Sequence, residues 1–99
     1  MTDADQIARF KLLTEQLIPQ RAREQRWPLR LDHCFKRVCL DHAFHDVWYR
    51  HLKKPAERHI CGEPLARALQ CAEDLLADDG TLLQFRNEES LRRRGKLRG

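Results

Sequence analysis

Hydrophobic and polar residues alternate with helical spacing over most of the chain. Over residues 3–18 the apolar side chains recur every three or four positions, which predicts an amphipathic helix with one buried stripe. The stripe consists of Ile7, Phe10, Leu13, Thr14, Leu17 and Ile18. Pro19 follows directly and predicts the end of this helix.

Residues 32–54 form the most informative segment, DHCFKRVCLDHAFHDVWYRHLKK. On a helical wheel Phe35 and Val38 lie on one side, while Phe44 and Val47 lie on the opposite side. A helix with apolar residues on two sides contacts its neighbours from two directions. An aspartate at its first position suits a helix N-cap, and two lysines followed by a proline predict its end. We therefore expect one long helix at the centre of the domain.

The pattern predicts two further helices in the second half of the chain. Pro64 lies in the first turn of one of them, and the Asp79-Gly80 pair predicts its end. Its apolar face is the most regular in the chain and consists of Leu65, Ala68, Leu69, Ala72, Leu75 and Leu76. Thr81 to Gln84 has the spacing of a capping box and predicts the start of the last helix.

The resulting prediction is an all-α, four-helix single domain over residues 1–90, built around a long central helix of about residues 32–54. Residues 19–31 contain two prolines, which predicts an extended connector. Residues 91–99 are mostly charged and predict a basic, flexible tail. The sequence shows no internal repeat and no strand with strict alternation.

Length and composition narrow the class of protein. At 99 residues the chain has the size of one domain, and 41% hydrophobic with 34% charged residues is typical of a globular fold. No apolar run is long enough to span a bilayer, and the first ten residues lack a signal-peptide pattern. We therefore expect a cytoplasmic protein without membrane contact. Its four cysteines are then expected to be thiols.

Positive charge is concentrated in two segments of this chain, whose formal net charge is +4. From residue 86 onward, six lysines and arginines face two glutamates. The other segment includes Arg21, Arg23, Arg26 and Trp27, and an aromatic residue among arginines can stack on a base while the guanidinium groups contact phosphates. Nucleic acid or an acidic protein is the predicted partner. The alternative is that Trp27 is a core anchor and that the tail only aids solubility.

A metal site is the sharpest competing hypothesis. Cys39 and His42 are three residues apart on one helical face, and His59 and Cys61 follow in the next connector. Two cysteines and two histidines are a ligand set that zinc accepts. However, the spacing matches no established zinc pattern, and buried cysteines in a helical core need no metal. We therefore predict no metal ligands and no cofactor.

Covalent catalysis has one candidate nucleophile. Cys34 lies near the start of the predicted central helix, where the helix dipole favours a thiolate, and His33 and Arg37 are close in sequence. The negative charge of Asp32 at the same helix start opposes thiolate formation. Nothing in the sequence resembles an oxyanion hole or a substrate-binding glycine loop, so whether the chain is an enzyme stays open.

Several short motifs resemble a set of short uncharacterised bacterial and fungal proteins. The motifs are Trp27-Pro28-x-Arg30-Leu31-Asp32-His33-Cys34-Phe35-x-Arg37, then Trp48, Lys54-Pro55-Ala56, and Asn87-x-x-Ser90-Leu91-x-x-Arg94-Gly95-Lys96. Some of those proteins carry an acetyltransferase label, although the sequence here has neither the strands nor the glycines that such an enzyme needs. The resemblance directs attention to His33, Cys34, Arg37, Trp48, Ser90 and Arg94 as positions that converge.

Two interpretations of these positions stay open. In one, Arg37 pairs with Asp41 or with helix-end carbonyls, while Asn87 and Ser90 fasten the last helix. In the other, His33, Cys34, Arg37 and Arg94 surround an anion. The sequence therefore predicts a small non-enzymatic binding or adaptor module whose favoured ligand is nucleic acid or another polyanion. The alternative is a small enzyme or metal-dependent module that uses the Cys/His cluster of the central helix.

Overall fold

The computed structural model of the chain describes residues 2–27 and 32–95, except for the side chains of residues 32 and 33. The described residues contain helices and turns but no strand, so the predicted all-α fold is confirmed. The helical elements in chain order are α1 (Asp3–Leu12), η1 (Leu13–Leu17), α2 (Ile18–Gln25), α3 (Asp32–Phe44), η2 (Trp48–Arg50), η3 (Ala56–Arg58), α4 (Gly62–Ala77) and α5 (Thr81–Arg93).

The first helix is longer than predicted, because the chain continues through Pro19 as α1, η1 and α2. The segment η1 is a π-helical turn, in which the backbone N–H of Ile18 donates to the carbonyl of Leu13, five residues back. This wider turn displaces the carbonyls that a proline ring would strike in a regular α-helix. The prediction of an extended connector from residue 19 is therefore wrong as far as Gln25, and residues 28–31 lie outside the described part.

Helix α2 ends at Arg26, which adopts a left-handed backbone conformation with φ of 57°. The N–H of Trp27 donates to the carbonyl of Ala22, and the N–H of Arg26 lies 3.4 Å from the carbonyl of Arg23. This pair of bonds is the Schellman motif that closes many helices. It turns the chain so that Trp27 enters the core, where only 4% of its surface is exposed.

The central helix α3 is shorter than predicted, because it stops at Phe44 and not near Lys54. His45 has φ of 53°, and a second Schellman motif forms from the N–H groups of His45 and Asp46 to the carbonyls of His42 and Asp41. Residues 45–61 then form a connector that contains the two short 3-10 turns η2 and η3. The connector and helix α3 together supply the site described below.

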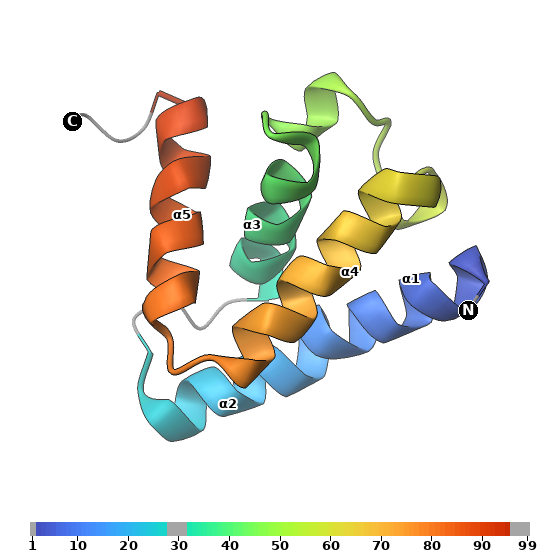
Figure 1. The fold of residues 1–99 in the computed structure, drawn as a ribbon. Coiled ribbons are helices and arrows are strands. Elements are labelled where there is room, and N and C mark those ends of the chain that lie inside the picture. The colour runs from blue at the N-terminus through green and yellow to red at the C-terminus, as the bar shows by residue number, and fades with distance from the viewer. Residues whose placement is uncertain (1, 28–31, 96–99) are drawn as a thin grey trace.

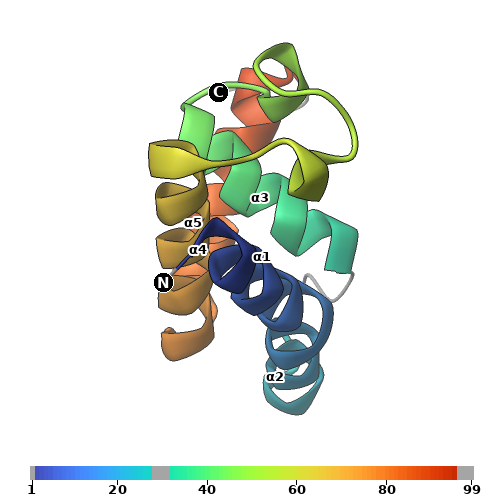
Figure 2. The same cartoon turned by 90° about the vertical axis from the view of Figure 1, so that its right-hand side faces the viewer.

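Helices α3 and α5 stand side by side and run in the same direction, while α1 with α2 and α4 pass across them (Figure 1). The view turned by 90° shows α1 beside α4, and α4 also packs against α3 (Figure 2). The α4–α5 turn lies beside the end of α2, and the C-terminal ends of α3 and α5 meet at the opposite end of the molecule (Figure 1). The fold therefore has two distinct ends, joined by the length of α5.

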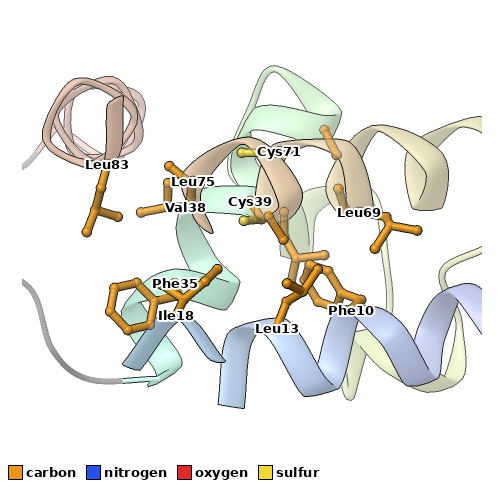
Figure 3. Close-up of a cluster of buried hydrophobic side chains, with 14 of the residues drawn as sticks. Phe10, Leu13, Ile18, Phe35, Val38, Cys39, Leu69, Cys71, Leu75 and Leu83 are labelled. Atoms are coloured by element: carbon orange, nitrogen blue, oxygen red, sulfur yellow. The ribbon is translucent and has the colours of Figure 1, made fainter. Parts of the chain in front are cut away.

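The hydrophobic core lies where all these helices face one another (Figure 3). Every long helix contributes fully buried side chains, including Phe10, Leu13, Ile18, Phe35, Val38, Leu65, Leu75 and Leu83. Phe44, Trp48, Leu76, Ile7 and Leu17 are only partly buried and pack against the edge of this cluster. Cys39 of α3 and Cys71 of α4 are buried in it as free thiols.

Helix α5 extends to Arg93 and therefore includes residues that the sequence assigned to a flexible tail. Arg94 follows directly and is fixed by side-chain contacts, and Gly95 closes the helix end with φ of 69°. The ordered domain thus reaches past residue 90, and residues 96–99 lie outside the description. Within the described residues, no helix combines the length and apolar character needed to cross a bilayer.

Candidate anion-binding site

A buried carboxylate connects the ends of α3 and α5. Asp41 is fully buried, and its Oδ2 accepts hydrogen bonds from Ser90 Oγ at 2.6 Å and Arg94 Nε at 2.9 Å. Its Oδ1 accepts from Arg94 Nη2 at 3.1 Å and from the backbone N–H of Trp48 at 3.0 Å. The sequence had suggested a surface ion pair between Arg37 and Asp41, four residues apart. That interpretation is wrong, because Asp41 pairs with Arg94 instead.

Arg37 is held by neutral partners. Its Nη1 donates to Ser90 Oγ at 2.8 Å, and its Nη2 donates to the side-chain oxygen of Asn87 at 2.6 Å. The expectation that Asn87 and Ser90 fasten the last helix is confirmed by these two bonds. Arg37 forms no ion pair with any carboxylate whose side chain the structure describes. Its guanidinium is therefore fixed in place without a direct contact to a described carboxylate, and Ser90 Oγ lies between it and Asp41.

A cleft of about 330 Å³ opens beside Arg37, between helix α3 and the connector. Its lining is mainly apolar and carries charged side chains at several points. The residues that line it are Lys36, Arg37, Leu40, Trp48, Lys54, Pro55, Ala56 and Glu57. The volume is at the lower end of the range for small-molecule sites.

Two of the charged residues that line the cleft, Lys36 and Glu57, form an ion pair, and Lys36 is shared with a second carboxylate, Glu15. Lys36 Nζ lies 2.8 Å from Glu15 Oε1 and 3.2 Å from Glu57 Oε1, so one ammonium joins η1, α3 and η3. Burial acts to lower the pKa of Lys36, but hydrogen bonds to the two glutamates outweigh it and raise that pKa. Burial acts to raise the pKa of Glu57, but hydrogen bonds to its carboxylate, including that from Lys36, lower it. Arg37 and Lys54 thus remain as the cations of the cleft that the described carboxylates do not pair.

An exposed tyrosine lies next to this cleft. Tyr49 in η2 has 47% of its surface exposed, and two cations lie over its ring. The Nζ of Lys54 is 4.9 Å and the guanidinium carbon of Arg94 is 5.2 Å from the ring centroid. Both distances are in the range of cation–π contacts. We call Tyr49, Arg50, Lys53, Lys54 and Arg94 the Tyr49 face.

The other predicted basic–aromatic segment has a different structure. Trp27 is buried and packs against Gly80, so its ring is not available to stack on a base. Arg21 lies 5.9 Å from the Trp27 ring and 3.4 Å from the carbonyl oxygen of Asp78. Arg23 and Arg26 are exposed. The stacking role predicted for Trp27 therefore does not agree with the structure, whereas its role as a core anchor does.

Four residues, His33, Cys34, Arg37 and Arg94, are predicted from the sequence to surround an anion. Arg37 and Arg94 lie within one hydrogen-bonded network, joined through Ser90 and Asp41. Cys34 is a half-buried free thiol near the start of α3. The side chain of His33 lies outside the described part, so its predicted contact with an anion stays a prediction.

The Cys/His candidates for metal binding are separated in the fold. Cys39 is buried against Cys71, and burial and this neighbouring thiol raise its pKa. His59 and Cys61 are exposed in the connector. Among the described residues, no group of three or more His, Cys, Asp and Glu is placed to hold a metal ion.

Sequence reasoning missed Tyr49, Lys54 and the buried state of Asp41. Tyr49 and Lys54 were placed in a helix that ends earlier, which hid the second cluster of an aromatic residue with cations, Trp48-Tyr49-Arg50 followed by Lys53-Lys54. No protein-family model, curated protein or solved structure matches this chain, so the site is interpreted from its geometry alone.

Proposed function

We propose that this protein is a small non-enzymatic binding module whose ligand is nucleic acid or another polyanion, and that it binds through the Tyr49 face. The observation that carries this proposal is the half-exposed Tyr49 ring, which has two cations, Lys54 and Arg94, close to it. A base can stack on such a ring, and its flanking phosphates then meet the neighbouring cations.

The charges around Tyr49 support a negatively charged ligand. Residues 45–59 contain four lysines and arginines against two carboxylates. Arg50 and Lys53 are exposed, so they can contact phosphates at the same time. Electrostatic contacts of this kind give binding that salt weakens strongly.

The position of Tyr49 in the connector supports a single strand over a duplex as the proposed ligand. The Tyr49 face belongs to a connector with two short 3-10 turns, not to a long exposed helix that enters a major groove. An unpaired base presents its flat surface to an aromatic side chain, whereas a paired base does not. We therefore expect single-stranded RNA or DNA to bind more tightly than the corresponding duplex.

Fluorescence anisotropy with a short labelled single-stranded oligonucleotide tests the proposal. Tyr49→Ala should weaken binding by about 1–3 kcal/mol without changing the salt dependence. Arg50→Gln combined with Lys53→Gln should reduce the slope of log K against log salt by about 1.4–1.8, because each lost phosphate contact removes roughly 0.7–0.9.

A double variant at the other end of the molecule provides the matched control. Arg23→Gln with Arg26→Gln removes the same charge from exposed positions and should leave affinity nearly unchanged. If this control loses as much affinity as the Arg50/Lys53 variant, the predicted segment around Arg21 carries the binding instead. If neither the oligonucleotide nor heparin binds at low salt, the polyanion proposal fails.

A further inference from the structure

The cleft beside Arg37 has the properties of a site for a small ligand, separate from the exposed surface of Tyr49. Its lining combines an apolar wall from Leu40, Trp48 and Pro55 with a guanidinium and an ammonium. A pocket of this size and composition suits a ligand with an apolar body and one polar group.

Arg37 is a cation that lines this cleft in a fixed position. Its guanidinium is fixed by Ser90 and Asn87, which are both uncharged. Asp41, a fully buried carboxylate nearby, forms an ion pair with Arg94, whose side chain is 16% exposed. The fold therefore holds the Arg37 guanidinium at the cleft, while the Asp41 carboxylate pairs with Arg94.

The other charges of the cleft lead to the same conclusion. Glu57 lines the cleft and shares Lys36 with Glu15, so Lys36 offsets the charge of only one of these two carboxylates. Lys54 is exposed, and its Nζ lies over the Tyr49 ring. Arg37 and Lys54 thus line the cleft without an ion pair to a carboxylate whose side chain the structure describes, and phosphate or carboxylate groups are the ligand chemistry that suits such cations.

We propose that this cleft binds a small organic anion, in which one phosphate or carboxylate contacts Arg37 and Lys54 and an apolar body covers Trp48, Leu40 and Pro55. This inference goes beyond the proposed function, because it concerns a small molecule and depends on Arg37. The two proposed sites share Lys54, so they are distinguished by Arg37, which lines the cleft and is not part of the Tyr49 face.

Two-dimensional NMR of the isotope-labelled full chain provides the test, with phenyl phosphate and benzoate as probes. The indole N–H signal of Trp48 should shift in a saturable manner, while that of Trp27, at the other end of the molecule, should stay in place. Inorganic phosphate and phenol, which each carry half of the proposed chemistry, should bind at least about tenfold more weakly than phenyl phosphate. Comparison of the two aromatic probes shows whether phosphate or carboxylate is preferred.

Variants connect the binding to the proposed residues. Arg37→Lys keeps the charge but loses the planar fork, and it should weaken phenyl phosphate binding about tenfold. Arg92→Lys is the matched control on exposed α5 and should have no effect. If the Arg37 variant does not fold, Lys54→Gln at the exposed rim should still weaken binding severalfold.

Three results would overturn the inference. The first is that neither phenyl phosphate nor benzoate gives a saturable shift at the Trp48 indole. The second is that phenol binds as tightly as phenyl phosphate, which would leave the cations without a role. The third is an equal loss of affinity in Arg92→Lys, which would indicate only general attraction to a basic surface.

Discussion

Trp27 and Tyr49 resemble each other in sequence, since each is an aromatic residue among basic residues that follows the end of a helix. In the structure they differ completely: 4% of Trp27 is exposed but 47% of Tyr49 is. Trp27 packs against Gly80 in the turn before α5, where a Cβ on Gly80 would lie 2.7 Å from the indole nitrogen. An aromatic residue between cations therefore indicates a ligand site only where the fold leaves its ring exposed.

The two ends of the molecule are also held together by different forces. At the Trp27 end, an indole fills the space between α2 and the α4–α5 turn. At the Tyr49 end, the charges of Asp41 and Arg94 join α3 to α5 with support from Ser90. Apolar packing is insensitive to salt and pH, whereas a charge network depends on both.

The largest effect is expected from Trp27→Ala. Removal of a buried indole should lower the free energy of unfolding by about 3–5 kcal/mol, which is enough to unfold much of a domain of this size. Tyr49→Ala serves as the comparison and should leave the urea midpoint nearly unchanged, because its ring is half exposed. Similar losses in both variants would show that the two aromatic residues do not differ as described.

Asp41→Asn is expected to have the next largest effect. The substitution leaves Arg94 without its anion and turns a side-chain NH2 or a weaker acceptor toward Ser90, at a cost of about 3 kcal/mol. Asp46→Asn, at an exposed pair with Arg50, should change the denaturation midpoint much less. An Asp41 variant as stable as the wild type would show that the network does not hold α5.

A smaller, pH-dependent effect is expected at the Tyr49 end from His42. Burial, together with Arg86, His45 and Arg93, lowers the pKa of His42 in spite of the opposing charge of Glu89. Below the ordinary value of 6.5, the unfolded chain binds a proton that the folded protein resists. Stability should therefore fall as the pH decreases from about 7.5 to about 5.5, as measured by urea denaturation.

His42→Gln should flatten that pH profile, while His59→Gln, at an exposed position in the connector, should not. Three carboxylates, Asp46, Glu57 and Asp79, have lowered pKa values and stabilise the fold at pH values above their ordinary pKa of about 4. Their contribution to stability is lost only as the pH falls below about 4, which is a lower range than that of His42. A profile that is equally steep without His42 would contradict this assignment.

The smallest effects concern a feature that both ends share. Arg26 and His45 each close a helix in a left-handed conformation that glycine adopts more easily. Arg26→Gly and His45→Gly should each raise the free energy of unfolding by about 0.5–1 kcal/mol. Arg23→Gly, within regular α2, is the control and should lower it by about 1 kcal/mol. A loss of stability at Arg26 or His45 would show that side-chain contacts outweigh the backbone strain.

The sequence predicted the class of fold because apolar spacing determines which faces become buried. It placed the third helix well, since Leu65, Ala68, Leu69 and Leu75 form one regular stripe that the structure buries. It could not predict the end of α3, because His45 occupies a position where glycine is the usual indicator. When a helix ends at a residue other than glycine, the local sequence gives little indication of where it ends.

The candidate site was only partly predictable for a related reason. The sequence indicates Arg37, Asn87, Ser90 and Arg94 as positions of interest, and all four share a network with Asp41. The partner of Asp41 could not be found by spacing, because Arg94 lies 53 residues away and only the parallel packing of α3 and α5 brings it close. Exposure of Tyr49 likewise depends on tertiary structure.

The π-helical turn η1 makes the effect of a deletion at Gln16 depend on Pro19. This turn places Leu13 and Ile18, which are five residues apart, on the same buried side. A π-helical turn contains one residue more than an α-helical turn, and here the apolar stripe continues across it. Deletion of exposed Gln16 would restore a regular helix, but Pro19 would then clash inside it. We therefore expect the chain to tolerate deletion of Gln16 better when Pro19 has already been replaced.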